Sequence, residues 1–259
     1  MTLILLICML ASSVLGSLPV SGAGCGWYTK RNTEHKQPPL DPAFSYIEQY
    51  DAYYIDRRHG DSTEEKVLYL TFDAGYENGN VEKILDTLKA EGVPGAFFVL
   101  GHLVQKNTAL VLRMKEEGHL VCNHTMHHRD MTGVASEEEF SRELLELASL
   151  YREKIGGEMA PYYRPPEGRF TEENLKMAQK LGYKTVFWSF AYADWDNNKQ
   201  PSRETAIQKI LDHTHNGAVI LLHPTSATNA AILPELIHRW REMGYRFGTL
   251  DELTSTEEA

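Results

Sequence analysis

The stretch that decides the fold is Val67-Leu-Tyr-Leu-Thr-Phe-Asp-Ala-Gly75, an apolar run that ends on a carboxylate and a glycine. Apolar and aromatic residues in such a run predict a buried β-strand. A second run, Gly95-Ala-Phe-Phe-Val-Leu100, is apolar without alternation, which is typical of a parallel sheet covered on both faces. Between the two runs, the apolar residues at 81, 84, 85 and 88 have helical spacing. These segments together predict a strand–helix–strand unit.

The same alternation continues toward the C-terminus. The sequence predicts helices over residues 109–117, 136–155, 171–181, 202–213 and 230–243, and strands over 119–122, 162–164, 184–190, 218–222 and 245–250. Repeated β/α units predict a parallel sheet, and right-handed crossovers curl it into a distorted or incomplete (β/α) barrel with about seven parallel strands. An open, doubly wound sheet is the alternative, but no G-x-G-x-x-G fingerprint of a dinucleotide site follows any strand.

The chain divides into three parts by composition. Residues 1–23 contain an apolar run too short for a comfortable membrane span, and the run precedes the small residues Ser21-Gly22-Ala23. This predicts a signal peptide and export, with a retained N-terminal anchor and membrane association as the alternative. Residues 24–65 are polar and rich in tyrosine, and we expect an ordered lead-in that packs on the main domain. Residues 66–259 hold the β/α repeats.

Composition and charge exclude some classes of function. Apolar residues make up 42% and charged residues 24%, as in an ordinary soluble globular protein. The net charge of −10 argues against a nucleic-acid partner, because phosphate contacts need clustered lysine and arginine. Three cysteines, one of them in the leader, give no disulfide framework.

Reactive side chains stand at the ends of five predicted strands. Parallel α/β folds carry their chemistry at the C-terminal ends of the strands, and those ends hold Asp73, His124 with His128, Arg164, Asp194 and His223. Each residue alone also has a structural interpretation. Asp73 could cap a helix, and His223 could be a hydrogen-bonded core histidine. Convergence on one rim instead predicts an acid–base site, where the two histidines of H-x-x-x-H can reach one metal ion.

The motifs T-F-D-x-G, H-T-x-x-H, R-P-P-x-G, D-W and L-L-H occur in this order between residues 66 and 253. In this order they resemble the five motifs of the polysaccharide deacetylases, the NodB-homology enzymes of carbohydrate esterase family 4. The run 71–79 and the tyrosine-rich lead-in are most similar to the delta-lactam-biosynthetic de-N-acetylases of spore-forming bacteria. The resemblance implies de-N-acetylation of N-acetylmuramic acid in a peptidoglycan glycan strand, leading to muramic δ-lactam in spore cortex. It places the enzyme in the cell wall or in the intermembrane space of the forespore.

The resemblance also implies roles for individual residues. Asp73 would be the general base on a metal-associated water, and His223 the general acid that protonates the leaving amine. Arg164 would orient the base, and Asp194 would hold His223 or Arg164. His124 and His128 would bind a divalent metal ion, zinc or a similar ion.

Three further residues are candidates for substrate binding. A backbone N–H beside Tyr163 or Arg164 could donate to the oxyanion of the tetrahedral intermediate. Arg169 could pair with a substrate carboxylate, and Trp195 could stack on a sugar face.

One position departs from the family pattern, which has a second aspartate, a metal ligand, directly after the base. Here that position is Ala74, so we expect the metal to be weakly bound. Glu77 could supply a substitute carboxylate, the lactyl carboxylate of muramic acid could complete the ligand shell, or the ion could be held by the histidines alone. We favour the lactyl carboxylate, because the substrate of this subfamily brings that group with it.

Two other functions compete with this interpretation. A deacetylase of chitin-like or N-acetylglucosamine polymers would use the same catalytic residues. A non-catalytic module that binds wall glycans would explain Ala74, but such a module needs no acid–base pair, and Asp73 and His223 supply one.

Overall fold

The computed structural model describes residues 24–134 and 136–255. The predicted signal peptide or anchor, residues 1–23, lies outside the described residues. Among the helices in this part of the chain, none has both the length and the apolar character needed to cross a bilayer.

One sheet of eight strands forms the centre of the molecule, and every pairing in it is parallel. Its order is β10-β3-β4-β5-β6-β8-β2, and β9 pairs with β3. The strands are β2 (Ala52–Tyr53), β3 (Lys66–Ala74), β4 (Ala96–Val99), β5 (Leu120–Asn123), β6 (Tyr162–Tyr163), β8 (Lys184–Val186), β9 (Ala218–Leu222) and β10 (Tyr245–Phe247).

The sheet curls until its two sides meet. Past the end of β8, Phe190 bridges to Ile220 of β9, and the Ser189 N–H donates to the Val219 carbonyl at 2.9 Å. Because β9 also pairs with β3, the strands run around a distorted barrel, which confirms the predicted architecture. The seven strands of the repeat region are joined by β2 from the lead-in.

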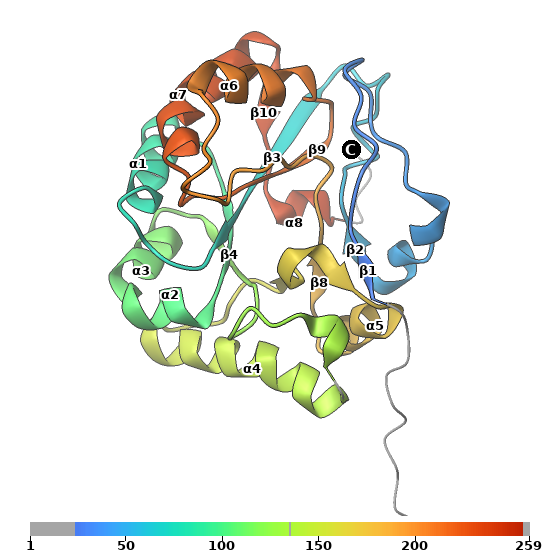
Figure 1. Cartoon of the computed structure of the whole chain (residues 1–259), viewed down its shortest axis with the longest axis vertical. Coiled ribbons are helices and arrows are strands. Elements are labelled where there is room, and N and C mark those ends of the chain that lie inside the picture. Colours follow the sequence, from blue (N-terminus) through green and yellow to red (C-terminus); the bar gives the residue numbers. More distant parts are fainter. Residues whose placement is uncertain (1–23, 135, 256–259) are drawn as a thin grey trace, which may run out of the picture.

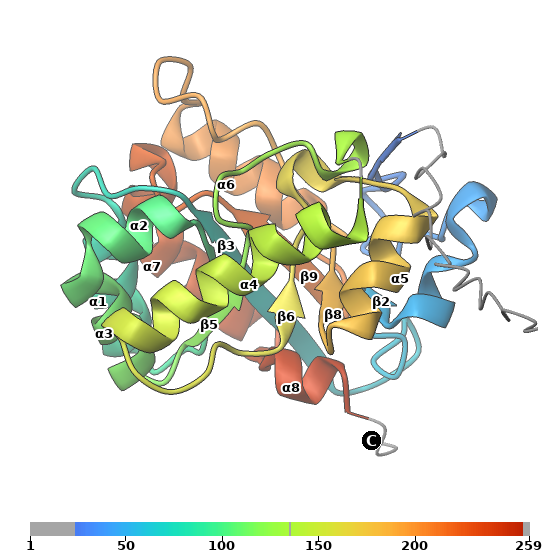
Figure 2. The same ribbon diagram turned by 90° about the horizontal axis from the view of Figure 1, so that it is seen from below.

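Helices cover the outside of the barrel (Figure 1), and Figure 2 shows α4 lying across it from below. They are α1 (Val81–Glu91), α2 (Gly101–Lys106), α3 (Thr108–Glu116), α4 (Glu137–Lys154), α5 (Glu172–Lys180), α6 (Arg203–Asp212), α7 (Ala227–Glu242) and the short α8 (Leu250–Leu253). The sequence did not predict α2 or α8. Strand β10 also ends at Phe247, three residues before the predicted end, because Thr249 caps α8 by accepting the Glu252 N–H.

The alternation along β3 determines which side chains reach the interior of the barrel. Leu68, Leu70, Phe72 and Ala74 belong to the core between sheet and helices. Val67 and Tyr69 belong to the core inside the barrel. Because successive side chains of a strand point to opposite faces, Asp73 lies on the inner face, at the mouth of the barrel.

The lead-in packs along the β8 side of the barrel. Strand β1 (Cys25–Gly26) pairs antiparallel with β7 (Arg169–Phe170). Trp27 stacks on Phe187 with ring centroids 4.4 Å apart and donates its indole N–H to the Trp188 carbonyl at 2.8 Å. Short 3-10 turns at Pro42–Phe44 and Ile47–Tyr50 add Phe44 and Ile47 to this cluster. The lead-in therefore shares its hydrophobic core with the barrel.

Candidate active site

Asp73 lies one residue before the end of β3, beside a buried arginine. The Arg164 Nη1–H donates to Asp73 Oδ1 at 2.8 Å, and the Arg164 side chain is fully buried. Burial opposes ionisation of Asp73, but the positive charge and the hydrogen bond of Arg164 act against burial, and the pKa of the carboxyl is lowered. Asp73 is therefore held as a carboxylate.

Arg164 is itself fixed on several sides. Its Nε–H donates to the Val186 carbonyl at 2.8 Å, and Nη2 donates to Thr71 Oγ1 at 3.0 Å. Its guanidinium also lies over the Phe98 ring, 4.1 Å from the centroid. A planar donor held in this way leaves the Asp73 carboxylate little freedom to rotate.

The histidine pair follows β5. The Nδ1 of His124 lies 2.8 Å from the Arg164 carbonyl, so Nδ1 carries the proton and Nε2 presents a lone pair. Burial lowers the pKa of His124 to about 4, which keeps the ring neutral. His124 Nε2 lies 3.6 Å from Asp73 Oδ2, and the His128 ring lies 5.1 Å from the His124 ring, centroid to centroid.

His223 and Asp194 form a second pair. The Nδ1 of His223 donates to Asp194 Oδ1 at 2.6 Å, and the His223 backbone N–H donates to Oδ2 at 2.8 Å. Burial alone would lower the pKa of His223, but the hydrogen bond and charge of Asp194 outweigh burial and raise it. Of the two expected partners, Asp194 therefore holds His223 and not Arg164. The His223 side chain remains 25% exposed, so its Nε2 side is open to a substrate.

The two pairs face one another across neighbouring strands. Phe72 of β3 pairs with Leu222 of β9, so Asp73 and His223 follow paired residues at the same rim. Their charges also perturb each other, since Asp73 raises the pKa of His223. The structure thus brings the carboxylate and the imidazole that were predicted as base and acid to one mouth of the barrel.

The loop between the two histidines predicted as metal ligands is braced from α4. Glu143, on the buried face of α4, accepts the His127 backbone N–H and the His127 ring, both at 3.0 Å. Thr125 and His128 both adopt left-handed backbone conformations, with φ of 74° and 55°. Such conformations cost free energy and persist only where the surroundings enforce them.

The predicted substrate residues differ in their surroundings. Trp195 is 61% exposed, and its ring centroid lies 6.2 Å from that of His223. Arg169 pairs with Asp130 at 2.9 Å while its side chain stays 46% exposed. Tyr163 is fully buried against Phe140, so its side chain cannot contact a sugar.

The expected oxyanion donor needs a correction. The Arg164 backbone N–H donates to the Asn123 carbonyl at 3.0 Å as part of the sheet, so it cannot also bind an oxyanion. The Tyr163 N–H belongs to the parallel pairing of β6 with β8, in which Tyr162 lies opposite Lys184 and Tyr163 opposite Thr185, so neither predicted N–H is free to bind an oxyanion.

The residues at the site fit a divalent ion in part. His124 presents the unprotonated nitrogen that a metal requires, and His128 lies beside it. Within residues 24–134 and 136–255, however, no three histidine, cysteine, aspartate or glutamate side chains gather as a metal site. Glu77 does not complete such a set among these residues.

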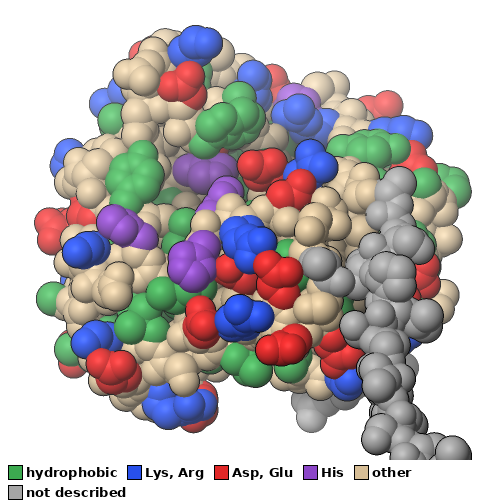
Figure 3. Space-filling view, turned by 60° about the horizontal axis from the view of Figure 1, so that its bottom comes forward, with side chains coloured by type: hydrophobic (Ala, Val, Ile, Leu, Met, Phe, Trp, Pro, Cys, Tyr) green, Lys and Arg blue, Asp and Glu red, His purple; other side chains and the backbone are tan. Residues whose placement is uncertain are grey.

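Hydrophobic and charged side chains surround a group of histidines on one face of the molecule (Figure 3).

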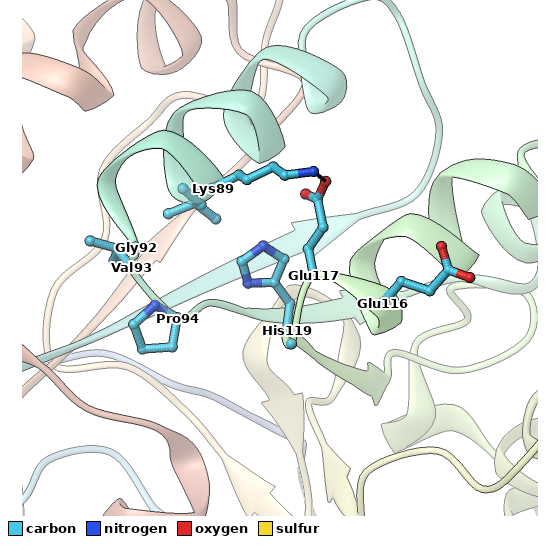
Figure 4. Close-up of a pocket in the computed structure, with 9 residues that line it drawn as sticks. Lys89, Gly92, Val93, Pro94, Glu116, Glu117 and His119 are labelled. Carbon is cyan, nitrogen blue, oxygen red and sulfur yellow. Dashed lines mark hydrogen bonds and ion pairs between the residues drawn. The ribbon is translucent and has the colours of Figure 1, made fainter.

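A separate hollow of about 430 Å³ lies where α1 and α3 lead into β4 and β5, away from the ends of the strands that carry the site (Figure 4). It is lined by Lys89, Glu117 and His119 among others. Glu117 is already paired there with Lys89 and Arg113, and the His119 ring accepts the Gly95 N–H.

Sequence reasoning missed several residues of the site. Thr71 and Glu143 hold Arg164 and His127, and Asn229 donates to Asp194 Oδ2 at 2.6 Å. Thr71 lies two residues before Asp73 on the same face of β3, which the period of a strand could have revealed. No sequence signal marks Glu143 or Asn229, because each resembles an ordinary polar residue of a helix.

Comparisons with known proteins agree with the geometry. A family model described as polysaccharide deacetylase matches residues 60–186. The peptidoglycan-N-acetylmuramic acid deacetylase PdaA of Bacillus subtilis is 38% identical over 96% of this chain and 93% of its own. A peptidoglycan-N-acetylglucosamine deacetylase of Bacillus cereus is 32% identical over 73% of this chain and 88% of its own. The solved structure of Bacillus subtilis PdaA, described as a family 4 carbohydrate esterase, superposes with a TM-score of 0.83, covering 91% of this chain and 98% of that one at 39% identity.

Proposed function

Because the chain belongs to the polysaccharide deacetylase family, we propose that it hydrolyses the N-acetyl amide of N-acetylmuramic acid residues in peptidoglycan. The observation that carries the proposal is the opposed pair at the barrel mouth, Asp73 held by Arg164 and His223 held by Asp194. The muramic acid substrate rests on the likeness to the Bacillus subtilis enzyme over nearly the whole chain.

The two pairs divide the proton transfers of amide hydrolysis between them. Asp73 accepts a proton from the attacking water as the oxygen adds to the acetyl carbon. His223, protonated because Asp194 raises its pKa, gives its proton to the amine nitrogen as the carbon–nitrogen bond breaks. The products are acetate and the free amine of the sugar.

The predicted metal ion belongs to this proposal. His124 and His128 would hold it, and when bound it would supply positive charge for the oxyanion. With Ala74 in place of the family's aspartate, the protein offers fewer charged ligands, so weak binding is expected.

We retain the hypothesis that the lactyl carboxylate of muramic acid completes the ligand shell. Zinc should then bind at least tenfold more tightly in the presence of a muramic-acid oligosaccharide than beside the matching glucosamine oligosaccharide. Calorimetric titration of zinc into the protein with each sugar measures this ratio, and equal affinities would reject the idea.

The product has a chemical consequence. Once the 2-amine of muramic acid is free and its lactyl carboxyl carries no peptide, the amine can attack that carboxyl and close a six-membered lactam with loss of water. We therefore place the enzyme before muramic δ-lactam formation in spore cortex, outside the cytoplasm, in the cell wall or the intermembrane space of the forespore.

Three side chains at the rim are proposed to bind the glycan. Trp195 is exposed beside His223, and Tyr76 is 42% exposed, with its hydroxyl accepting from Asn197 at 2.7 Å. Aromatic faces of this kind stack on sugar rings. Arg169 would exchange Asp130 for the carboxylate of the substrate.

The decisive experiment measures acetate released from peptide-stripped peptidoglycan oligosaccharides that contain N-acetylmuramic acid. We expect release by the unmodified protein and a loss of about a hundredfold or more in Asp73→Asn, because the base is removed while the shape is kept. An inactive parent protein that still binds the glycan would instead identify a binding module.

A second candidate substrate is N-acetylglucosamine. The Bacillus cereus relative carries that substrate in its name. Oligosaccharides that contain only N-acetylglucosamine test it in the same assay, and faster acetate release from them than from muramic-acid oligosaccharides would favour the second candidate.

A further inference from the structure

Helix α7 presents a buried asparagine to the Asp194–His223 pair. Asn229 is 1% exposed, and its Nδ2 donates to Asp194 Oδ2 at 2.6 Å and to the His223 carbonyl at 3.1 Å. Asp194 Oδ2 thereby receives two N–H groups, one from Asn229 and one from the His223 backbone. With that oxygen occupied, Oδ1 is left to accept the proton on His223 Nδ1.

The orientation of the amide is itself fixed. The Tyr192 hydroxyl donates to Asn229 Oδ1, so the amide nitrogen must face Asp194. Tyr192 is buried in the hydrophobic core, two residues before Asp194. A chain of hydrogen bonds therefore runs from Tyr192 through Asn229 and Asp194 to His223.

A second asparagine of this fold shows what the position ordinarily does. Asn174 occupies the third residue of α5, as Asn229 does in α7, and in both helices the backbone N–H bonds to the N-cap oxygen. The Asn174 side chain turns back to accept the Thr171 N–H and completes a capping box. The Asn229 side chain bonds to Asp194 in place of that contact. It therefore stabilises the Asp194–His223 pair and not the start of the helix.

We propose that Asn229, oriented by Tyr192, is a positioning residue that holds Asp194 in the one arrangement that presents Nε2 of His223 to the leaving amine. This proposal rests on the proposed function for its kinetic consequence. The titratable or charged groups that face the pair are Asp73, Arg164 and Tyr192.

The substitution Asn229→Asp tests the proposal with almost no change in shape. Two carboxyls at this distance cannot both be ionised readily, so at acidic pH the new one stays protonated and donates O–H to Asp194. As the pH rises it loses that proton, Asp194 loses its donor, and the pair is disturbed. We expect kcat relative to the parent protein to fall at least tenfold between pH 5 and pH 8, with KM unchanged.

The matched control is Asn174→Asp, the same change at the same helical position away from the site. Its kcat relative to the parent protein should be flat across this pH range. A flat ratio in Asn229→Asp as well would overturn the proposal. If Asn229→Asp does not fold, as judged by thermal unfolding, Tyr192→Phe decides instead. It should lower kcat about threefold to tenfold at unchanged KM, and a parent-like kcat would overturn the proposal.

Nuclear magnetic resonance titration of the His223 ring separates this inference from the proposed function. The added negative charge in Asn229→Asp should move the midpoint of His223 titration upward, whether or not the protein releases acetate. An unchanged midpoint contradicts the hydrogen-bond chain. A shifted midpoint in a protein that releases no acetate would retain the chain and reject the deacetylase.

Discussion

His124 and His223 stand at the same rim, yet the fold moves their pKa values in opposite directions. His124 directs Nδ1–H at a backbone carbonyl in a buried setting, and burial lowers its pKa to about 4. His223 directs Nδ1–H at the Asp194 carboxylate, which overcomes burial and raises its pKa. The surroundings thus favour the neutral form of one ring, which a metal ligand needs, and the protonated form of the other, which a general acid needs.

The substitution Asp194→Asn should test how the Asp194 carboxylate acts on His223. It removes the negative charge that favours imidazolium, so the pKa of His223 falls and the protonated acid is lost at lower pH. We expect the alkaline limb of the kcat profile to move toward acid, with kcat near neutral pH reduced about a hundredfold. Asp196→Asn on the same loop is the control, and an alkaline limb that stays in place in Asp194→Asn would exclude His223 as the acid.

At this scale the sequence predicted which residues meet at the rim better than it predicted the partners that hold them. Asp73, Arg164 and His223 follow apolar runs, and the geometry of parallel strands gathers such positions at one rim. The pairing of Asp194 with His223 depends on the path of an irregular loop, which has no periodicity to read. The buried position of Tyr163 depends on packing against Phe140 of α4, and no local pattern predicts that contact.

Among the helices, α4 acts on the site without touching a reacting group. Its Glu143 is buried and accepts two hydrogen bonds from His127, the residue between the predicted ligands. The carbonyl of Glu143 also accepts the Met126 N–H at 3.0 Å. The loop from Thr125 to His128 is therefore held by α4 as well as by its own hydrogen bond from the His128 N–H to Thr125 Oγ1 at 3.0 Å.

Glu143→Ala should loosen this loop. The His127 N–H loses its partner, and we expect about 1–3 kcal/mol of destabilisation together with a reduced affinity for zinc. Chemical denaturation and calorimetric titration measure the two effects. The control is Glu146→Ala, on the exposed face of the same helix, which should change neither stability nor zinc affinity. Unchanged zinc affinity in Glu143→Ala would show that the contact between Glu143 and His127 does not affect the predicted metal ligands.

At the scale of elements, the sequence predicted those helices and strands whose apolar residues follow a regular spacing. The long helices and the buried strands follow apolar spacing, because burial against a sheet requires it. The sequence did not predict helix α2, because this helix begins directly after Leu100. There the apolar strand leads into Gly101 without a turn signal. The sequence also did not predict that α7 contributes Asn229 to the site, since Asn229 resembles any asparagine in a first helical turn.

For the whole molecule, the closure of the barrel depends on a few contacts between the end of β8 and β9. Ser189 lies at this seam, where its Oγ accepts the Val219 N–H at 3.1 Å and lies 2.8 Å from His215 Nε2. The lead-in covers the same side, with Trp27 donating to the Trp188 carbonyl. Neither contact follows from sequence pattern, because each joins residues far apart in the chain.

His215 makes this seam sensitive to acid. Its Nδ1 faces the His213 carbonyl at 2.9 Å, so Nδ1 carries the proton and Nε2 accepts from the Ser189 hydroxyl. Burial lowers the pKa of His215 to about 4, below the ordinary value of 6.5. Between these two pH values the imidazole of His215 is protonated in the unfolded chain and neutral in the folded protein. The free energy of unfolding therefore falls as the pH drops from about 6.5 to about 4.

The size of this effect follows from the shift, at about 3 kcal/mol once the pH is below both values. Urea unfolding between pH 7 and pH 4 should show a steeper loss of stability in the parent protein than in His215→Gln, which cannot titrate. His238→Gln, at an exposed position, should follow the parent curve. Parallel curves for the parent protein and His215→Gln would mean that the seam does not depend on a neutral His215. The acid limit of the fold would then be set by other groups, such as His124 at the barrel mouth.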